Sequence, residues 1–295
     1  MSARLSRPAA AVLAVALLAA PAAGYAKAAP AKAAAAPVED IQAALSEQRY
    51  VDAGRMIDQA LLSGAKDPRL IVLGGELSLA RGRHAQALQA FKQARDYPEV
   101  RARALQGQGL ALSLAGRSDE ALGVLKEAVA ADPSAWRAWN ALGGEYDRRR
   151  DWTNAEAAYA KALAGSGGAA IVLNNRGFSS LLQGRLDASI TDLVGALEKR
   201  PDLAVARTNL RLAMGLKGDY DRALAAGPQE DRAALLNNVG YAALLRGDQA
   251  RAQALFNQAL AAKGQFYSRA AYNLETASGL GVHATNAGSA ADVGP

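Results

Sequence analysis

Small and large apolar residues recur along most of the chain with a period of 34 positions. In five successive segments, an alanine or serine is followed four residues later by a large apolar residue and seven residues later by an alanine. Positions i, i+4 and i+7 lie on one face of an α-helix, so each segment predicts a helix with an apolar stripe. The three positions are occupied by Ala53, Ala87, Ala121, Ala155 and Ser189, by Ile57, Phe91, Leu125, Tyr159 and Leu193, and by Ala60, Ala94, Ala128, Ala162 and Ala196.

Glycines of the same period predict a second helix upstream in each unit. The glycines of the first set lie on this helix, which a neighbouring helix must cross closely. The glycines of the second set lie seven residues later, and the members of each set are separated by 34 residues or a multiple of 34. Each unit is therefore expected to be a pair of antiparallel helices that buries its faces against its neighbours. The first set is Gly75, Gly109, Gly143 and Gly177, and the second is Gly82, Gly116 and Gly184, with Arg150 in the missing position.

The phase of the repeat places the units along the chain. Units are expected to start near residues 34, 68, 102, 136, 170 and 204. The sixth runs short through Gly227-Pro228, so a seventh begins early, near residue 233, and residues 266–280 predict the first helix of an eighth unit that serves as a cap. The predicted fold over residues 38–280 is all-α, an α-solenoid of about seven helix pairs plus a C-terminal capping helix. A coiled coil or a plain helix bundle is the alternative.

This pattern resembles the tetratricopeptide repeat, whose signature is Trp-x2-Leu-Gly-x2-Tyr, then Ala-x3-Phe, then Pro. Pro133 and Pro201 lie where that family ends a unit. The resemblance implies that the first helix of each pair lines a concave, partner-binding surface. Residues 136–167 match best, through Trp139, Leu142, Gly143, Tyr146, Ala155, Tyr159 and Ala162.

Composition argues against an enzyme. The 295 residues include no cysteine and two histidines, His84 and His283, which leaves almost nothing for thiol chemistry or a multi-histidine metal site. Glu145 and Asp147 are two apart on a predicted helix and do not face each other, so they make a poor catalytic pair. Residues 165–168 are glycine-rich, but no lysine follows them and no strand precedes them, as a phosphate loop requires. We expect no catalytic site, no cofactor, no metal and no small-molecule substrate.

The N-terminus is typical of an exported protein. Residues 1–26 have two arginines, a twelve-residue apolar run and small residues at a cleavage site, which predicts a secretory signal peptide. An uncleaved anchor or a disordered start is the alternative. Residues 27–37 predict an Ala/Lys/Pro linker, and residues 281–295 a disordered tail. The mature protein is then periplasmic.

The formal net charge of +6 comes from interleaved charges, which do not indicate a nucleic-acid partner. The densest basic run, residues 148–150, is expected to be an exposed helix end. The alternative is a patch for anionic lipid or an acidic protein.

Asparagines on the first helices predict a partner-binding groove. Asn175, Asn209 and Asn238 share one phase of three successive units. An amide offers a donor and an acceptor, so it can pair with an extended peptide backbone, as in the asparagine ladders of some members of the family that this chain resembles. The alternative is that these amides bond within their own helix pair and that the nearby aromatic residues are packing residues. The predicted groove comprises Asn140, Asn174, Asn175, Phe178, Asn209, Asn237, Asn238 and Tyr241.

The C-terminal half is similar to the tight-adherence (Flp) pilus-assembly proteins of the TadD type. The strings that carry this similarity are VLNNRGFSSLLQGRLDASI (172–190), LLNNVGYAALLRGDQARAQALFNQAL (235–260) and QFYSRAAYNLETA (265–277). The resemblance implies an exported scaffold that helps to assemble the pilus secretion machine, with an outer-membrane secretin or pilus components as partners. Members are commonly lipoproteins, whereas this chain has no lipobox cysteine, so any association with the outer membrane would run through protein partners. A general adaptor in outer-membrane protein or cell-wall assembly is the alternative function.

Overall fold

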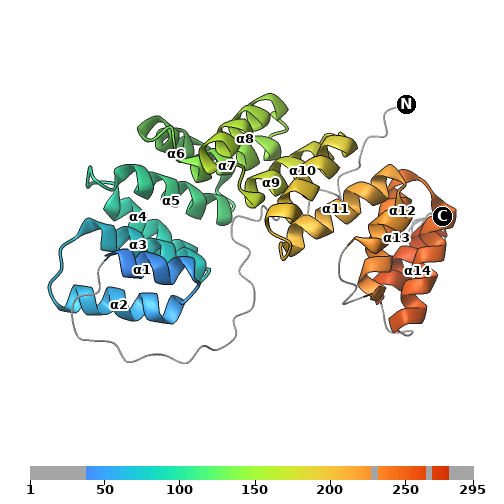
Figure 1. Cartoon of the computed structure of the whole chain (residues 1–295), viewed down its shortest axis with the longest axis horizontal. Coiled ribbons are helices and arrows are strands. Elements are labelled where there is room, and N and C mark those ends of the chain that lie inside the picture. The colour runs from blue at the N-terminus through green and yellow to red at the C-terminus, as the bar shows by residue number, and fades with distance from the viewer. Residues whose placement is uncertain (1–37, 227–231, 264–267, 279–295) are drawn as a thin grey trace, which may run out of the picture. The chain divides into compact units, whose positions relative to one another are not determined.

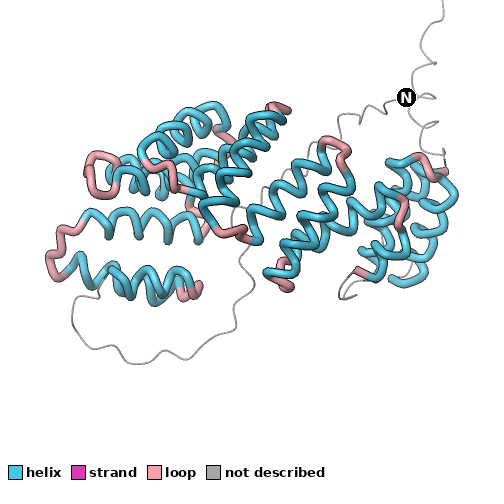
Figure 2. The backbone as a smooth tube through the Cα atoms, turned by 45° about the horizontal axis from the view of Figure 1, so that its top comes forward, coloured by secondary structure: helices cyan, strands magenta, loops and turns pink. Residues whose placement is uncertain are grey.

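The computed structural model describes residues 38–226, 232–263 and 268–278, and throughout these residues the regular elements are α-helices (Figures 1 and 2). The predicted signal peptide, the linker, the Gly227-Pro228 break and the tail from residue 281 lie outside the described residues. The helices are α1 (Val38–Ser46), α2 (Tyr50–Leu62), α3 (Pro68–Ala80), α4 (His84–Ala94), α5 (Arg101–Leu114), α6 (Ser118–Ala131), α7 (Trp136–Arg148), α8 (Trp152–Ser166), α9 (Ala170–Leu182), α10 (Leu186–Lys199), α11 (Ala204–Lys217), α12 (Tyr220–Ala225), α13 (Arg232–Arg246), α14 (Gln249–Lys263) and α15 (Ser268–Ala277).

Consecutive helices pack in tandem, which confirms the predicted α-solenoid. Odd-numbered helices are the first helices of the pairs and even-numbered helices the second, as in α3 with α4, α5 with α6 and α13 with α14. Second helices also pack on the next first helix, as α4 does on α5 and α6 on α7. The contacts define two compact units, which divide within α9 between Asn175 and Arg176. We call residues 38–175 unit 1 and the described residues from 176 onward unit 2.

The crossing glycines lie against the large residues sixteen positions later, as their period predicts. A Cβ atom placed on Gly143 would lie 2.5 Å from Cε1 of Tyr159, well inside the 3.0 Å that Cβ contacts respect. A side chain in place of Gly143 would therefore displace the second helix of this repeat. The same relation joins Gly75 to Phe91 at 2.7 Å, Gly109 to Leu125 at 2.5 Å, Gly177 to Leu193 at 2.9 Å and Gly240 to Phe256 at 2.8 Å.

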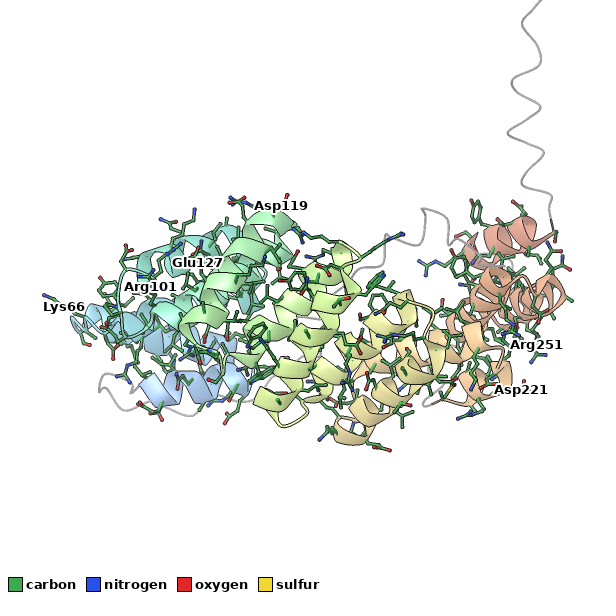
Figure 3. All side chains as sticks on the ribbon, turned by 90° about the horizontal axis from the view of Figure 1, so that it is seen from above. Lys66, Arg101, Asp119, Glu127, Asp221 and Arg251 are labelled. Atoms are coloured by element: carbon green, nitrogen blue, oxygen red, sulfur yellow. The ribbon has the colours of Figure 1, made fainter. Side chains whose placement is uncertain are left out.

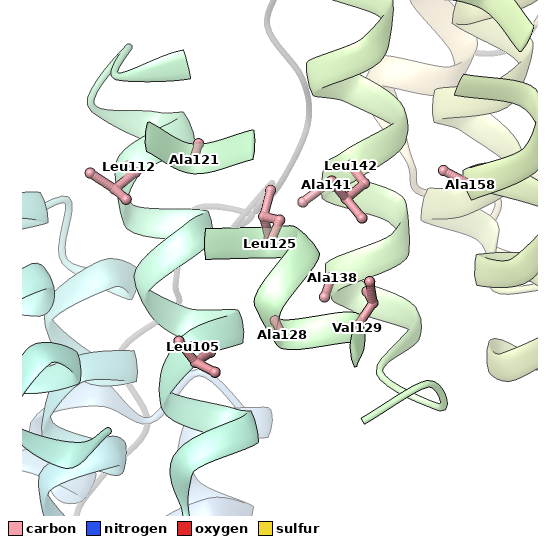
Figure 4. Close-up of a cluster of buried hydrophobic side chains, with 10 residues drawn as sticks. All are labelled: Leu105, Leu112, Ala121, Leu125, Ala128, Val129, Ala138, Ala141, Leu142 and Ala158. Atoms are coloured by element: carbon pink, nitrogen blue, oxygen red, sulfur yellow. The ribbon is translucent and has the colours of Figure 1, made fainter. Parts of the chain in front are cut away.

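The predicted apolar stripes form the core. Ala121, Leu125 and Ala128 of α6 have no exposed surface and pack between α5 and α7 (Figure 4). Full burial of a leucine side chain contributes about 2 kcal/mol to stability. The core of each repeat consists of a few such large residues and many alanines. The other members of this cluster are Leu105, Leu112, Val129, Ala138, Ala141, Leu142 and Ala158.

The turn between the two helices of a pair requires a left-handed backbone. Gly116 and Gly184 adopt φ of 74° and 73° there, and Arg150, in the same phase, adopts φ of 57°. Gln48 holds that phase in the first repeat with φ of 60°. A side chain in this conformation costs about 1–2 kcal/mol relative to a right-handed one, so the packing of these two repeats imposes the turn on residues that disfavour it.

The sixth repeat departs from the others at its second helix. Its α12 is the six-residue helix Tyr220–Ala225. The crossing phase, which is glycine in the second to fifth and the seventh repeats, is Arg211 here. Its Nε donates a hydrogen bond to the carbonyl oxygen of Ala226 at 2.9 Å. In addition, a Cβ placed on Gly215 of α11 would lie 2.6 Å from Cβ of Ala242 in α13. The short second helix thus coincides with a close approach of two first helices.

Candidate partner-binding faces

Three of the predicted groove asparagines form one buried network in unit 1. Asn140 lies on α7, and Asn174 and Asn175 lie on α9. Nδ2 of Asn175 donates to Oδ1 of Asn140 at 3.1 Å, and Nδ2 of Asn174 donates to Oδ1 of Asn175 at 3.0 Å. All three side chains are buried. This network links two successive first helices through amides that satisfy one another.

A second amide network lies in unit 2. Nδ2 of Asn273 on α15 donates to Oδ1 of Asn237 on α13 at 2.9 Å, and Nδ2 of Asn237 approaches Oδ1 of Asn238 at 3.4 Å. Asn237 is buried, whereas Asn238 is exposed. The capping helix is therefore tied to α13 by the same kind of contact that links α7 and α9.

The burial of Asn140, Asn174, Asn175 and Asn237 places them inside the stack of helices. The side-chain amides of Asn175 and Asn237 are hydrogen-bonded to asparagine side chains of neighbouring first helices. Their side chains offer little surface to a partner. The predicted groove residues that reach solvent are Phe178, Asn209, Asn238 and Tyr241.

The first helices of unit 2 carry an apolar face. Phe178, Leu212 and Tyr241 share one phase of α9, α11 and α13, and all three reach solvent, Tyr241 with 37% of its surface. A second phase, four residues further along each helix, adds partly exposed leucines, so the two rows run side by side on one helix face. These leucines are Leu182, Leu216 and Leu245.

The first helices of unit 1 instead carry arginines at one phase, a feature that the sequence analysis missed although the 34-residue period contains it. They are Arg69 of α3, Arg103 of α5 and Arg137 of α7. Arg103 makes a bidentate ion pair with Glu76, with Nε–Oε1 and Nη2–Oε2 distances of 2.7 and 2.8 Å. Arg69 pairs with Asp67 at 2.6 Å. Arg137 stacks on the ring of Trp136, 4.3 Å from its centroid.

Buried acids of α7 hold the centre of unit 1 together. Glu145, 1% exposed, accepts a hydrogen bond from Ser113 at 2.6 Å and is also bonded to Ser118, Arg148 and Arg149. This cluster joins α5, α6 and α7. Two members of the basic run 148–150 are therefore partly buried in internal ion pairs, a correction to the exposed helix end expected for them.

The Asp147 side chain faces away from the Glu145 cluster, as predicted for two residues that lie two positions apart on a helix. Its carboxylate accepts the Tyr159 hydroxyl at 2.8 Å. Burial, together with the charge of Asp147 and the hydrogen bond to it, raises the pKa of the Tyr159 phenol well above its ordinary value. Tyr159 therefore stays protonated and keeps donating to Asp147.

Charged side chains also link successive repeats at the surface. Asp221 and Arg251, labelled in Figure 3, pair at 2.7 Å, and Asp119 pairs with Arg149 at 2.6 Å. Within the described residues, no cluster of three or more acidic, histidine or cysteine side chains is arranged to hold a metal ion. No helix among those same residues combines the length and hydrophobicity that a bilayer crossing needs.

Comparison with known proteins agrees with this architecture. A family profile described as tetratricopeptide repeat matches residues 72–135 and 107–170. A solved tetratricopeptide-repeat protein of Parabacteroides merdae aligns over 82% of this chain and 97% of its own, with 16% identity and a TM-score of 0.52. One from Thermus thermophilus aligns over 60% of this chain and 96% of its own, with 21% identity and a TM-score of 0.53. A comparison with curated proteins gives no match.

The larger Cut9–Hcn1 assembly of the APC/C also contains a similar chain. It aligns over 81% of this chain and 54% of its own, with 14% identity and a TM-score of 0.56. Such low identities establish the fold alone. Residues 72–170 carry tetratricopeptide repeats by their sequence, and the flanking helix pairs continue the same architecture, so the fold is a tetratricopeptide-repeat α-solenoid.

Proposed function

We propose that this protein is a non-catalytic periplasmic scaffold that binds protein partners along the first helices of its repeats. The observation that carries the proposal is the face of unit 2, where Asn238 and Tyr241 reach solvent beside the two apolar rows. Exposed aromatic and leucine side chains grouped on one face are typical of protein-binding surfaces. The exposed amide of Asn238 adds a polar group that can bond a partner's backbone.

The finer part of the proposal is a role in assembling a tight-adherence (Flp) pilus secretion machine. Its support is the similarity of residues 172–190, 235–260 and 265–277 to the TadD-type proteins. The secretory pattern of residues 1–26 supports a periplasmic location, because such segments direct export. The partners would be an outer-membrane secretin or pilus components. A general cell-envelope adaptor would use the same face for other proteins.

Affinity capture from a periplasmic extract of the source organism tests both parts. The wild-type chain should retain a defined set of envelope proteins, and the double substitution Asn238→Ala, Tyr241→Ala should lose them. The matched control is Asn257→Ala, Tyr272→Ala, which removes the same two residue types from exposed positions on α14 and α15. Circular dichroism melting would show that both variants remain folded.

The identity of the captured proteins separates the two functions. Secretin or pilus components support the pilus role, whereas other envelope proteins support the general adaptor. Capture that is equal for the wild type and the Asn238, Tyr241 variant would contradict the proposed face. Asn175→Ala is unsuitable for this test, because Asn175 is buried and bonded to Asn140.

A further inference from the structure

The outer face of α2, the second helix of the first repeat, carries the two most exposed large apolar side chains among the described residues. They are Val51 and Leu62, which are 80% and 88% exposed. α2 packs on α1 and α3 through its opposite face, which holds Ala53, Ile57 and Ala60 (Figure 1). Packing within the repeat therefore does not account for Val51 and Leu62, and such exposure indicates a surface that another molecule covers.

The other repeats do not share these two residues. In the second to fifth and the seventh repeats, the residues at these two phases are alanine, threonine or acidic residues. The architecture of the repeat therefore does not need a large apolar residue at either phase. The phase of Val51 is occupied by Ala85, Asp119, Thr153, Asp187 and Ala250, and the phase of Leu62 by Asp96, Ala130, Ala164, Glu198 and Ala261.

Arg55 and Asp58 lie between Val51 and Leu62 on the same exposed stripe. The four residues are separated by four, three and four positions, so their side chains lie on one face of the helix. Arg55 pairs with Asp52 of its own helix at 3.2 Å and stays exposed. Asp58 is exposed and has no ion-pair partner within the part of the chain that the structure describes. The stripe thus has apolar ends and opposite charges at its centre.

The spacing of this stripe is the same in either direction along the helix. The midpoint of Val51 and Leu62 coincides with that of Arg55 and Asp58, between residues 56 and 57. When two copies of α2 lie antiparallel about a twofold axis through this point, Val51 of each copy faces Leu62 of the other. Arg55 of each copy likewise faces Asp58 of the other. The apolar side chains then leave water, and each aspartate gains an arginine.

We propose that the protein forms a twofold-symmetric dimer through antiparallel pairing of α2 with α2 of a second copy. The order of the charges selects this occupant, because a parallel pairing would place each charge against its like. The inference goes beyond the proposed function, since it uses a second helix and leaves the first-helix faces to other proteins. A thirteen-residue helix is about 20 Å long. The interface is therefore small, and the dimer is weak and dependent on concentration.

Sedimentation equilibrium tests the dimer on the protein as its own cells process it, over about two decades of concentration. The average mass should rise toward twice that of the monomer. Leu62→Gln should weaken the dimer about tenfold, because it removes an apolar contact at both ends of the helix pair. Leu61→Gln is the matched control, since Leu61 is 52% exposed but lies about 100° away around the helix. It should dimerise like the wild type.

Charge reversal tests the pairing of Arg55 with Asp58. Arg55→Asp and Asp58→Arg, each alone, bring like charges together near the twofold axis, and each variant should remain monomeric. An equimolar mixture of the two variants should dimerise, because every charge then faces its opposite. Glu198→Arg on α10 is the control for Asp58→Arg, since it changes the net charge equally at an exposed position. It should dimerise like the wild type.

Cysteine cross-linking tests the antiparallel direction, and the chain has no cysteine of its own to interfere. Val51→Cys and Leu62→Cys on one chain lie about 16 Å apart along the helix, too far for a disulfide within it. Oxidation of this double variant should therefore give a covalent dimer. Either single variant should stay uncross-linked, whereas a parallel pairing would cross-link both. Thermal melting checks that every variant is folded.

Four results would overturn the inference. They are a monomer at every concentration, a dimer that Leu62→Gln leaves unchanged, cross-linking of the single cysteine variants, and no association in the mixture of charge variants. A monomer that loses captured envelope proteins through Leu62→Gln would also overturn it, because a different protein would then cover this face. A monomer that still captures envelope proteins through Asn238 and Tyr241 overturns this inference alone and leaves the proposed function intact.

Discussion

The fourth repeat (α7 and α8) and the sixth (α11 and α12) solve the same packing problem with opposite residue sizes. In the fourth, Gly143 leaves room for Tyr159, and the second helix extends over fifteen residues. In the sixth, Arg211 occupies the glycine phase, and the second helix ends after six residues. The guanidinium bonds the carbonyl of Ala226 just beyond that end.

A side chain at the crossing phase does not by itself shorten the second helix, because the first repeat has Ile41 at this phase and a thirteen-residue second helix. In the fourth repeat a side chain in place of Gly143 would overlap the ring of Tyr159, so the second helix approaches closely there. Where the arginine is present, its donors satisfy a carbonyl that the ended helix leaves without a partner. In the sixth repeat, the arginine at the crossing phase thus accompanies the shortened second helix and caps its end.

Gly143→Ala should break the fourth repeat most severely. The new Cβ would lie 2.5 Å from the ring of Tyr159, which the bond to Asp147 holds in place. We expect a loss of about 3 kcal/mol in the free energy of unfolding, the upper part of the usual range for overpacking. Urea denaturation followed by circular dichroism measures it. Gly123→Ala, with no atom within 4 Å of the new Cβ, should instead stabilise α6 by about 1 kcal/mol.

Arg211→Ala tests the opposite solution in the sixth repeat. Loss of the hydrogen bond from Nε to the carbonyl of Ala226 should cost about 2 kcal/mol, as for bonds that involve a charged group. Arg222→Ala on the adjoining α12 is the control, since that side chain is 67% exposed and its ion pair should contribute less than about 0.5 kcal/mol. Equal urea midpoints for the two variants would remove the proposed role of Arg211.

Arg150→Gly should bring the fourth repeat closer to the pattern of its neighbours. The residue adopts φ of 57°, which glycine reaches without steric cost, so the variant should gain about 1 kcal/mol. The reciprocal control is Gly184→Ala in the next repeat, at φ of 73°, which should lose a similar amount. A destabilised Arg150→Gly would mean that the arginine side chain contributes more than its backbone costs.

Ser189→Ala is expected to have the smallest effect, and a favourable one. Six other repeats have alanine at this phase, and the buried Ser189 hydroxyl has no hydrogen-bond partner among the described residues. Removing an unsatisfied hydroxyl should stabilise the protein by up to about 1 kcal/mol. Ser113→Ala, which removes a bonded buried hydroxyl from Glu145, should destabilise it. Stabilisation of both variants would contradict this account of buried hydroxyls.

The period of 34 predicted the helix pairs because close crossing demands a glycine and a large residue at fixed phases. It also predicted the capping helix, found at Ser268–Ala277. It did not reveal the burial of Asn175 or Asn237, because their partners lie 35 and 36 residues away, one or two steps off the period. When the repeats are aligned by phase, the two asparagines of such a pair fall at different positions of the repeat. The missing glycine at Arg211, by contrast, was visible in the sequence.

The crossing of glycine with a residue sixteen positions later also bears on how the chain folds. Each such contact closes a short segment, and the asparagine contacts close segments of about one repeat. Proteins dominated by contacts of low sequence separation fold rapidly, because little loop-closure entropy is lost before the contacts form. Each repeat can nucleate as soon as its own two helices are available, so a chain that emerges N-terminus first can consolidate repeat by repeat before synthesis ends.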